Sequence, residues 1–365
     1  MLVRRAPQAP PFCPNPACPF HTRTAGWPYA RAGFHRRRHP PRRVQRFRCR
    51  HCGRHFSEQT FRTTYWLKRP RLLRPVLHGL VAGSAFRQLA RSLEASPQTI
   101  ALMSARLARH CLLFHLRHRP TGPATEPLVL DSFQSFEHSQ YSPTLFHLLA
   151  GQRSHFCHGF TDSELRRSGS MRPAQKRRRA ELEAAFGRPD PRAIEHAVAE
   201  LLRIVLPDPQ PLALHTDDHA DYPRALARLP HLRVTHRTIS SRAARTPRNP
   251  LFAVNLLDLL IRHSSANHRR ETIAFSKRRQ SAAERLWVFL VWRNFMKWFS
   301  ERVPEATPAM RAGVATTKLT AAALLKRRLF VSQVHLPSHW AYYYWRTVST
   351  RRLPGCRRHR CVFAT

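Results

Sequence analysis

The chain has 365 residues, enough for two or three domains with a sizeable core. It carries 63 Lys and Arg against 21 Asp and Glu, a formal net charge of +42, which calls for a polyanionic partner such as nucleic acid. No apolar run approaches the length of a membrane span, about 18 residues, and residues 1–7 lack the apolar centre of a signal peptide. We therefore expect a cytoplasmic, nucleoid-associated protein with no membrane partner.

Four of the eight cysteines have the spacing of metal ligands. Cys13 and Cys18 form one pair, and Cys49 and Cys52 form a second pair that closes a tight knuckle. Zinc takes four thiolates tetrahedrally, so we predict a structural Zn²⁺ site and a zinc ribbon over residues 1–66. The segment looks too small and too polar to build its own core, and the metal would then supply its folding energy. Such a ribbon either binds DNA or braces a neighbouring domain.

Two alternatives stay open for these cysteines. His21 or His51 could replace one cysteine as a ligand, or the cysteines could be reduced structural residues without metal. The remaining cysteines are scattered and do not suggest a disulfide framework; they are Cys111, Cys157, Cys356 and Cys361.

Residues 67–118 have the pattern of a helix-turn-helix. Apolar residues at helical spacing predict helices over residues 72–81, 85–93 and about 97–114. Serines in capping positions begin the second and third helices, and a proline occupies the first turn of the third. The early polar face of the third helix, which includes Ser104, is a candidate for the DNA major groove, although an ordinary helical hairpin inside a larger domain is the alternative. The DNA-binding candidates in this region are Arg87, Gln98, Thr99 and Arg106.

Two apolar runs each lead to an aspartate. Residues 127–130 precede Asp131, and residues 211–214 come shortly before Asp217. We interpret both as buried strands that bring a carboxylate to their ends. Two such carboxylates together form a site for Mg²⁺ or Mn²⁺, whose chemistry suits phosphodiester cleavage. Taken singly, each aspartate could instead be a turn or helix-cap residue.

The order of elements around these strands predicts the fold class. Residues 126–300 show three antiparallel strands, a basic insertion over 164–190, and then helices that alternate with two further strands. This is the order of a ribonuclease H-like fold, a mixed β-sheet flanked by helices, within a multidomain α+β and α/β protein. Residues 301–365 form a basic C-terminal extension, in which the aromatic cluster at 340–345 more plausibly packs on the core than stacks on bases.

Several of these segments together resemble one protein family. They are RFRCRHCGRHFSEQTF, TDDHADYPRAL and RHSSANHRRETIAFSK, with the helix-turn-helix and the Asp131 strand in order between them. Over about residues 13–300 the chain resembles transposases of small bacterial insertion sequences, the DDE, RNase H-like kind with an N-terminal zinc ribbon. The resemblance implies cleavage and joining of DNA through two divalent metals held by Asp, Asp and Glu. It also implies a homo-oligomer that binds double-stranded element ends and target DNA.

The third carboxylate is where the sequence departs from this family. Asp131 matches the first aspartate, and Asp217, or Asp218 beside it, matches the second. The family's glutamate falls on Asn255. One helical turn further, Asp258 shares the face of Asn255 and is our candidate for a shifted third ligand.

Glu271 is a further candidate for the third carboxylate, but it lies in a basic run. A catalytically inactive, transposase-derived DNA-binding protein is therefore the first alternative. A sequence-specific regulator that shares only the ribbon and the helix-turn-helix is the second. The further DNA-binding candidates are Arg262, Arg269, Arg270 and Lys277.

Overall fold

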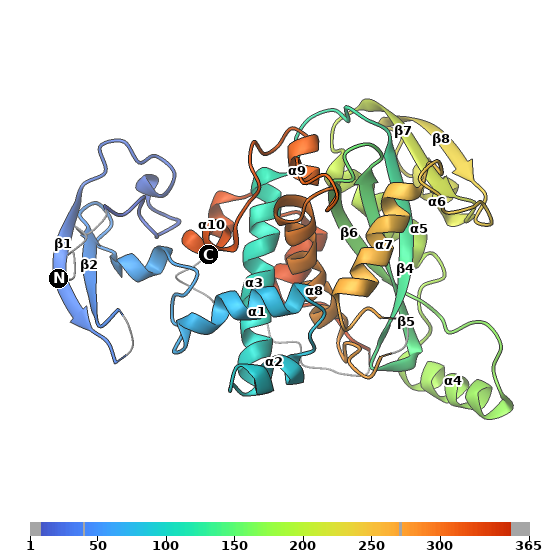
Figure 1. The fold of residues 1–365 in the computed structure, drawn as a ribbon, viewed down its shortest axis with the longest axis horizontal. Coiled ribbons are helices and arrows are strands. Elements are labelled where there is room, and N and C mark those ends of the chain that lie inside the picture. The colour runs from blue at the N-terminus through green and yellow to red at the C-terminus, as the bar shows by residue number, and fades with distance from the viewer. Residues whose placement is uncertain (1–8, 39–40, 270–271, 352–365) are drawn as a thin grey trace.

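A computed structural model describes residues 9–38, 41–269 and 272–351 (Figure 1). A small three-stranded sheet lies at one end of the molecule, and a five-stranded sheet with helices around it forms the other end. Helices α1, α2 and α3 lie between the two sheets (Figure 1). This arrangement confirms the predicted mixture of helices with a mixed, helix-flanked sheet.

The small sheet is antiparallel and contains the second pair of cysteines at its end. Its strands are β1 (Tyr29–Arg36), β2 (Arg43–Cys49) and β3 (His55–Ser57), in the order β1-β2-β3. We expected this segment to be too polar for a core of its own, and that expectation is wrong. Large aromatic rings are buried around the cysteines, and each covers much apolar area; they are Phe12, Trp27, Phe47, Phe56, Phe61 and, from far along the chain, Phe330.

Three helices follow the small sheet, close to the predicted ranges. They are α1 (Leu73–Val81), α2 (Phe86–Ser92) and α3 (Pro97–His118). The hydroxyl of Ser96 accepts a hydrogen bond from the backbone N–H of Thr99 at 3.1 Å and caps α3 as predicted. Ser104, however, is fully buried, so it does not belong to an exposed polar face. The reason is that α3 packs along α8 (Arg279–Val291) of the following layer.

The large sheet has the order β6-β5-β4-β7-β8. Strands β4, β5 and β6 form an antiparallel meander, whereas β7 runs parallel to both β4 and β8. The bounds are β4 (Leu128–Glu137), β5 (Ser139–Gly151), β6 (Cys157–Glu164), β7 (Gln210–Asp217) and β8 (Leu232–Ile239). The apolar residues that predicted these strands are buried in one cluster with the surrounding helices.

Different helices cover the two faces of this sheet. On one face, the hydroxyl of Thr161 donates a hydrogen bond of 2.7 Å to the carbonyl of Ala197 in α5. On the other face, the neighbouring Phe160 contacts Trp287 of α8 with ring centroids 4.7 Å apart. The helices beside the sheet are α5 (Ala193–Val205), α6 (Asp221–Ala227) and α7 (Phe252–Ser264). The two faces therefore carry alternate residues of each strand.

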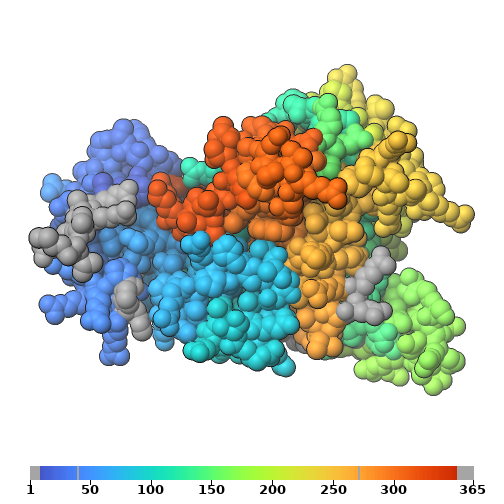
Figure 2. All heavy atoms as spheres, in the orientation of Figure 1, coloured from blue at the N-terminus to red at the C-terminus, as the bar shows by residue number. Residues whose placement is uncertain are grey.

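The basic insertion predicted over residues 164–190 contains a helix that the sequence analysis did not identify. Helix α4 (Pro173–Phe186) is largely exposed, and Leu182 is its buried residue. The region around α4 stands out from the body of the molecule at the end opposite the small sheet (Figure 2). Its helical period was hidden because nearly every position faces solvent and can be polar.

The C-terminal region packs on the rest of the molecule. Its helices are α9 (Pro308–Arg311), α10 (Ala321–Lys326) and α11 (Ser338–Trp345), and they follow a π-helical turn over Trp292–Met296. Trp340 is fully buried and donates a hydrogen bond of 2.8 Å from its indole nitrogen to the carbonyl of Phe160. The preferred interpretation of the aromatic cluster, packing on the core, is confirmed. Cys356, Cys361 and most of the predicted basic tail lie outside the described residues.

Within the part of the chain that the structure describes, we find no helix with the length and apolar character needed to cross a membrane.

Candidate metal centre and carboxylate site

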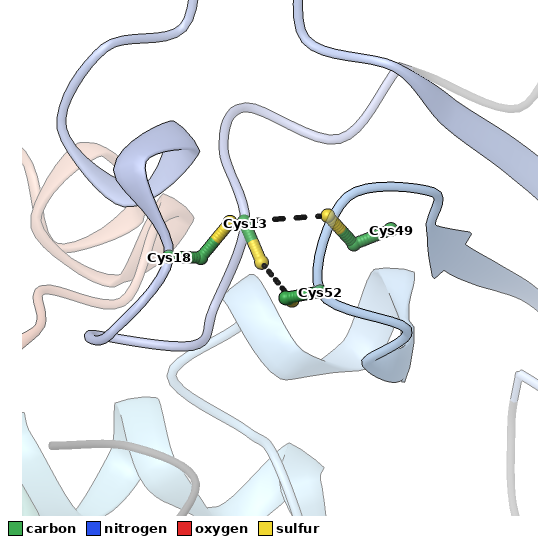
Figure 3. A group of neighbouring side chains, drawn as sticks. All are labelled: Cys13, Cys18, Cys49 and Cys52. Carbon is green, nitrogen blue, oxygen red and sulfur yellow. Dashed lines mark hydrogen bonds between the residues drawn. The ribbon is translucent and has the colours of Figure 1, made fainter.

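The four predicted zinc ligands come together between a loop and the end of β2 (Figure 3). Cys13 and Cys18 come from the loop, whereas Cys49 and Cys52 flank the turn after β2. All four sulfur atoms lie within 4.8 Å of one another. The Cys13–Cys52 and Cys18–Cys49 sulfur distances are 3.6 and 4.0 Å. Four thiolates around zinc, with metal–sulfur bonds of about 2.3 Å, stand about 3.8 Å apart, so this cluster could hold a zinc ion.

The backbone around the knuckle favours ionised sulfur. Gly53 adopts a φ of +71°, which closes the turn after Cys52. Burial opposes ionisation of Cys49. Backbone N–H groups of Cys52 and His51 and the indole N–H of Trp27 outweigh it and lower the pKa of Cys49 to about 7. The knuckle is therefore built to hold a thiolate, the form that binds zinc.

Neither histidine is needed as a substitute ligand. The Nδ1 and Nε2 atoms of His21 lie 2.7 Å from the carbonyl oxygen of Cys13 and 2.8 Å from the hydroxyl of Ser332. Both ring nitrogens are thus engaged away from the cluster. His51 lies beside it, with Nδ1 3.7 Å from the sulfur of Cys18, but the four cysteines alone supply the number of ligands that a tetrahedral zinc site needs.

Asp131 and Asp217 stand at the same level on neighbouring strands. Parallel pairing aligns Val129 of β4 with His215 of β7, and two residues further along each strand are Asp131 and Asp217. Since strands alternate with a period of two, both aspartates are on the face of the sheet that α7 covers. The sequence-based expectation that the two aspartates come from separate strands agrees with β4 and β7 being neighbours in the sheet.

Asp131 does not end its strand, contrary to our expectation. Strand β4 continues to Glu137 and stays paired with β5, but its pairing with β7 stops at Val129 and His215. Asp131 therefore lies where two neighbouring strands part. Burial raises its pKa to about 6. The charges of Asp217 and Asp258 act in the same direction, against the N–H of Ser132 and the charge of Arg245.

The two acids at the end of β7 are held differently. Asp217 accepts a hydrogen bond from the backbone N–H of His219 at 3.0 Å, which turns the chain toward α6. Asp218 is exposed, and hydrogen bonds from the backbone and hydroxyl of Ser241 lower its pKa. Asp217, rather than Asp218, shares the register of Asp131, so it is the better partner for that carboxylate.

Helix α7 brings Asp258 within electrostatic reach of Asp131. The guanidinium Nε of Arg262 lies 3.0 Å from Oδ1 of Asp258 and donates a hydrogen bond of 3.1 Å to Oδ2. Oδ1 is buried and accepts no hydrogen bond of its own in the described part of the structure. Asn255, one turn earlier, is half-buried on the same helix, and Glu271 lies outside the described residues.

The carboxylates are not gathered as tightly as the cysteines. Among the described residues, the cysteine cluster is the one group of three or more metal-binding side chains whose ligand atoms all lie within 4.8 Å. Asp131, Asp217 and Asp258 thus do not form such a close group.

A hydrogen-bonded chain behind Asp131 was not expected from the sequence. The backbone N–H of Ser132 donates to Oδ1 of Asp131 at 2.7 Å, and its hydroxyl lies 2.6 Å from Nδ1 of His147. The other ring nitrogen of His147 lies 2.9 Å from the hydroxyl of Ser163, and the Ser132 hydroxyl is 3.2 Å from that of Tyr222. Burial lowers the pKa of His147 to about 3, so the ring is neutral and ties β4, β5 and β6 together.

The predicted DNA-binding residues occupy varied positions. Arg87 and Gln98 are exposed at the starts of α2 and α3, whereas Thr99 is half-buried beside its capping serine. Arg106 donates a hydrogen bond of 3.0 Å to the carbonyl of Thr63, so it is partly committed to the fold. Of the others, Arg262 pairs with Asp258, Arg269 and Lys277 are exposed, and Arg270 lies outside the described residues.

Comparison with known proteins adds little to this geometry. No protein-family model matches the chain, and no curated protein matches it. Among solved structures, the chain is similar to a cryo-EM structure of a simian T-cell lymphotropic virus intasome in complex with PP2A regulatory subunit B56 gamma. The identity is 14%, the match covers 63% of this chain and 68% of that chain, and the TM-score is 0.25. A likeness this slight carries no argument about function.

Proposed function

We propose that the chain is a DDE-type transposase, a metal-dependent enzyme that binds the ends of an insertion element and cleaves and joins DNA strands. The observation that carries the proposal is that Asp131 and Asp217 each lie two residues beyond the last pairing of β4 with β7, with Asp258 of α7 within electrostatic reach of Asp131. The sheet order β6-β5-β4-β7-β8, with a parallel second half, supports it because a ribonuclease H-like fold is expected to have this order. The net charge of +42 supports a DNA partner.

The carboxylates fit a hard divalent cation such as Mg²⁺ or Mn²⁺. None of the ion pairs found among the described residues involves Asp131, and burial with the charges of Asp217 and Asp258 raises its pKa despite the charge of Arg245. A bound cation would supply compensating positive charge, activate a water or a DNA 3′-hydroxyl, and neutralise charge on the phosphate. Asp131 and Asp217 would hold it, and Asp258 would join them once its carboxylate turns from Arg262.

The rest of the chain would recognise and position DNA. We assign residues 1–66 as a zinc ribbon, 67–118 as a helix-turn-helix, 126–300 as the ribonuclease H-like core and 301–365 as a C-terminal extension. The exposed side chains of Arg87 and Gln98 are at the start of their helices, where base or phosphate contacts are sterically open. A homo-oligomer that pairs two DNA ends belongs to the same proposal.

The test is cleavage of DNA that carries the ends of the flanking element, in Mg²⁺. We expect Asp131→Asn, Asp217→Asn and Asp258→Asn each to lower the cleavage rate by about 100-fold or more, because each removes a charged ligand. Asp208→Asn is the matched control, since Asp208 is exposed in the loop before β7. Its rate should equal that of the native protein, and all variants should bind the same DNA.

The pattern of losses identifies the third ligand. If cleavage activity survives only in Asp258→Asn, the third metal ligand is a residue other than Asp258. The cleavage rate of Asn255→Ala would then be compared with that of the native protein. A native protein that binds the ends but never cleaves them would exclude the transposase and leave a DNA-binding protein derived from one. The Arg262–Asp258 ion pair is the observation that favours this second function, because it occupies the third carboxylate.

A further inference from the structure

A wide groove lies between the small sheet and the segment that leads to α1. Its volume is about 980 Å³, and its lining residues come from the loop between Cys13 and Cys18, from β1–β3 and the turns after β1 and β2, and from residues 59–60 and 65–68. The cationic side chains among them are Arg37, Arg46, Arg54 and Lys68. No aspartate or glutamate occurs among the lining residues that the structure describes. This ribbon groove is therefore shaped and charged for an anionic ligand.

Trp66 lines one side of the ribbon groove and is unusual in its exposure and its backbone conformation. Trp66 is 79% exposed, the most exposed tryptophan or phenylalanine among the described large apolar side chains. Its backbone has a φ of +60°, a left-handed conformation that is costly for a bulky residue. The adjacent Tyr65 ring meets it edge-on at 5.9 Å, and the guanidinium of Arg328 covers the Tyr65 ring at 5.3 Å. Tyr65 is thus supported from behind, while the Trp66 ring is left open to solvent.

We propose that the ribbon groove binds an unpaired stretch of DNA. One base of the strand stacks on Trp66, and Arg37, Arg46 and Lys68 bind the phosphates of the strand. An exposed indole beside several cations offers the two contacts that single-stranded nucleic acid needs, an aromatic face for a base and positive charge for the backbone. Duplex DNA buries its base faces in the stack, so it cannot use Trp66 in this way. The choice of DNA rests on the proposed function, but the groove is distinct from the carboxylate site.

Binding to the full-length, zinc-loaded protein tests this assignment. The probe is a fluorescent oligothymidylate of about 12 nucleotides, compared by anisotropy with a hairpin duplex of similar charge. We expect Trp66→Leu to weaken oligothymidylate binding by about 10-fold or more, because stacking of one base is lost. Trp66→Phe keeps an aromatic face and should retain most of the affinity. Duplex binding should be unchanged in both variants.

Two controls separate stacking from general loss of apolar surface or charge. Leu102→Ala removes another exposed apolar side chain, on α3, and should leave oligothymidylate binding unchanged. Arg46→Ala should weaken binding and lower the salt dependence by about one phosphate contact, whereas Arg178→Ala on the exposed α4 should do neither. Zinc content and melting temperature, measured for each variant, confirm that the ribbon is intact.

Equal affinity of Trp66→Leu and the native protein for oligothymidylate would overturn the proposal. An equal loss for the single strand and the hairpin would also overturn it, because the groove would then be a duplex surface. Asp131→Asn should bind oligothymidylate like the native protein. The same set of variants therefore distinguishes failure of the proposed DNA cleavage from failure of the proposed single-strand binding in the ribbon groove.

Discussion

At the scale of single residues, Asp131 is held in an environment that penalises its charge. Its carboxylate accepts one backbone hydrogen bond from Ser132 and faces the charges of Asp217 and Asp258. Burial is the largest cause of its raised pKa, about 6 against an ordinary 3.8. A site with this imbalance is prepared for a cation, since binding removes both the desolvation penalty and the repulsion between carboxylates.

The raised pKa predicts how the metal-free protein responds to pH. The folded state holds the proton of Asp131 more tightly than the unfolded state. The protonated Asp131 therefore contributes its full stabilisation of the folded state below pH 3.8, and this contribution is lost as the pH rises through about 6. At about 1.4 kcal/mol per pKa unit, the loss is about 3 kcal/mol. Denaturant unfolding between about pH 3 and about pH 7 without added Mg²⁺, in steps of about one pH unit, brackets both pKa values and measures it.

Asp131→Asn has no proton to lose, so the same titration should lack this component in the variant. Added Mg²⁺ should stabilise the native protein increasingly as the pH rises through about 6, because only the ionised carboxylate binds the cation. Identical pH profiles for the native protein and the variant would contradict the assigned environment. Asp208→Asn serves as the exposed control.

The sequence predicted some of these residues better than others. The placement of Asp131 and Asp217 on strands could be anticipated because both follow apolar runs of strand type. The chain through Ser132, His147 and Ser163 could not, because it depends on which residues face each other across β4, β5 and β6. The third carboxylate also stayed open, since the rotation of α7 about its axis decides which of its polar residues faces β4.

At the scale of elements, the four-cysteine cluster, which could hold a zinc ion, lies within the aromatic core of the small sheet. Removal of one ligand should abolish zinc binding, because a structural zinc site needs all four ligands to complete its tetrahedral coordination. We expect Cys49→Ser to lower bound zinc from one ion per chain to none and to unfold the ribbon, at a cost of up to about 10 kcal/mol of metal-binding free energy. Metal analysis and hydrogen exchange over β1–β3 measure this.

Cys157→Ala is the matched control for the zinc prediction. Cys157 is buried in β6, and burial raises the pKa of its thiol to about 12, far from the range in which a thiolate binds metal. Its replacement should leave the zinc content unchanged. Retention of zinc by Cys49→Ser would contradict the four-cysteine site and direct attention to His51, whose Nδ1 lies 3.7 Å from the sulfur of Cys18.

The errors in the sequence-based predictions of helices have one cause. Tertiary packing decides which residues of a helix are exposed, and the sequence does not show that packing. Helix α4 escaped prediction because, apart from Leu182, little of it is buried, so no apolar stripe marks it. Ser104 was assigned to an exposed face because α3 was expected to present its polar side to DNA, whereas α8 covers that region. Strand β4, by contrast, was located because its apolar run before Asp131 is buried on both faces of the sheet.

At the scale of the whole molecule, the C-terminal region joins three separate cores. Phe330 packs among the aromatic residues of the ribbon, Leu324 packs with the α1–α3 helices, and Trp340 packs beside the large sheet. Trp340 leaves no room at Gly159, where an added Cβ would lie 2.4 Å from the indole ring. Residues 308–351 therefore act as a structural strap across the described molecule rather than as a loose basic extension.

This strap predicts that two aromatic truncations have effects in different places. Trp340→Ala should lower the free energy of unfolding of the core by about 3–5 kcal/mol, because a fully buried indole and its hydrogen bond to Phe160 are lost. Phe330→Ala should increase hydrogen exchange mainly in β1–β3, since the ribbon loses the ring that closes its core. Tyr342→Ala, on the exposed side of α11, should change stability by less than about 0.5 kcal/mol. A uniform loss of protection in both Phe330→Ala and Trp340→Ala would instead mean that the ribbon and the sheet unfold as one cooperative unit.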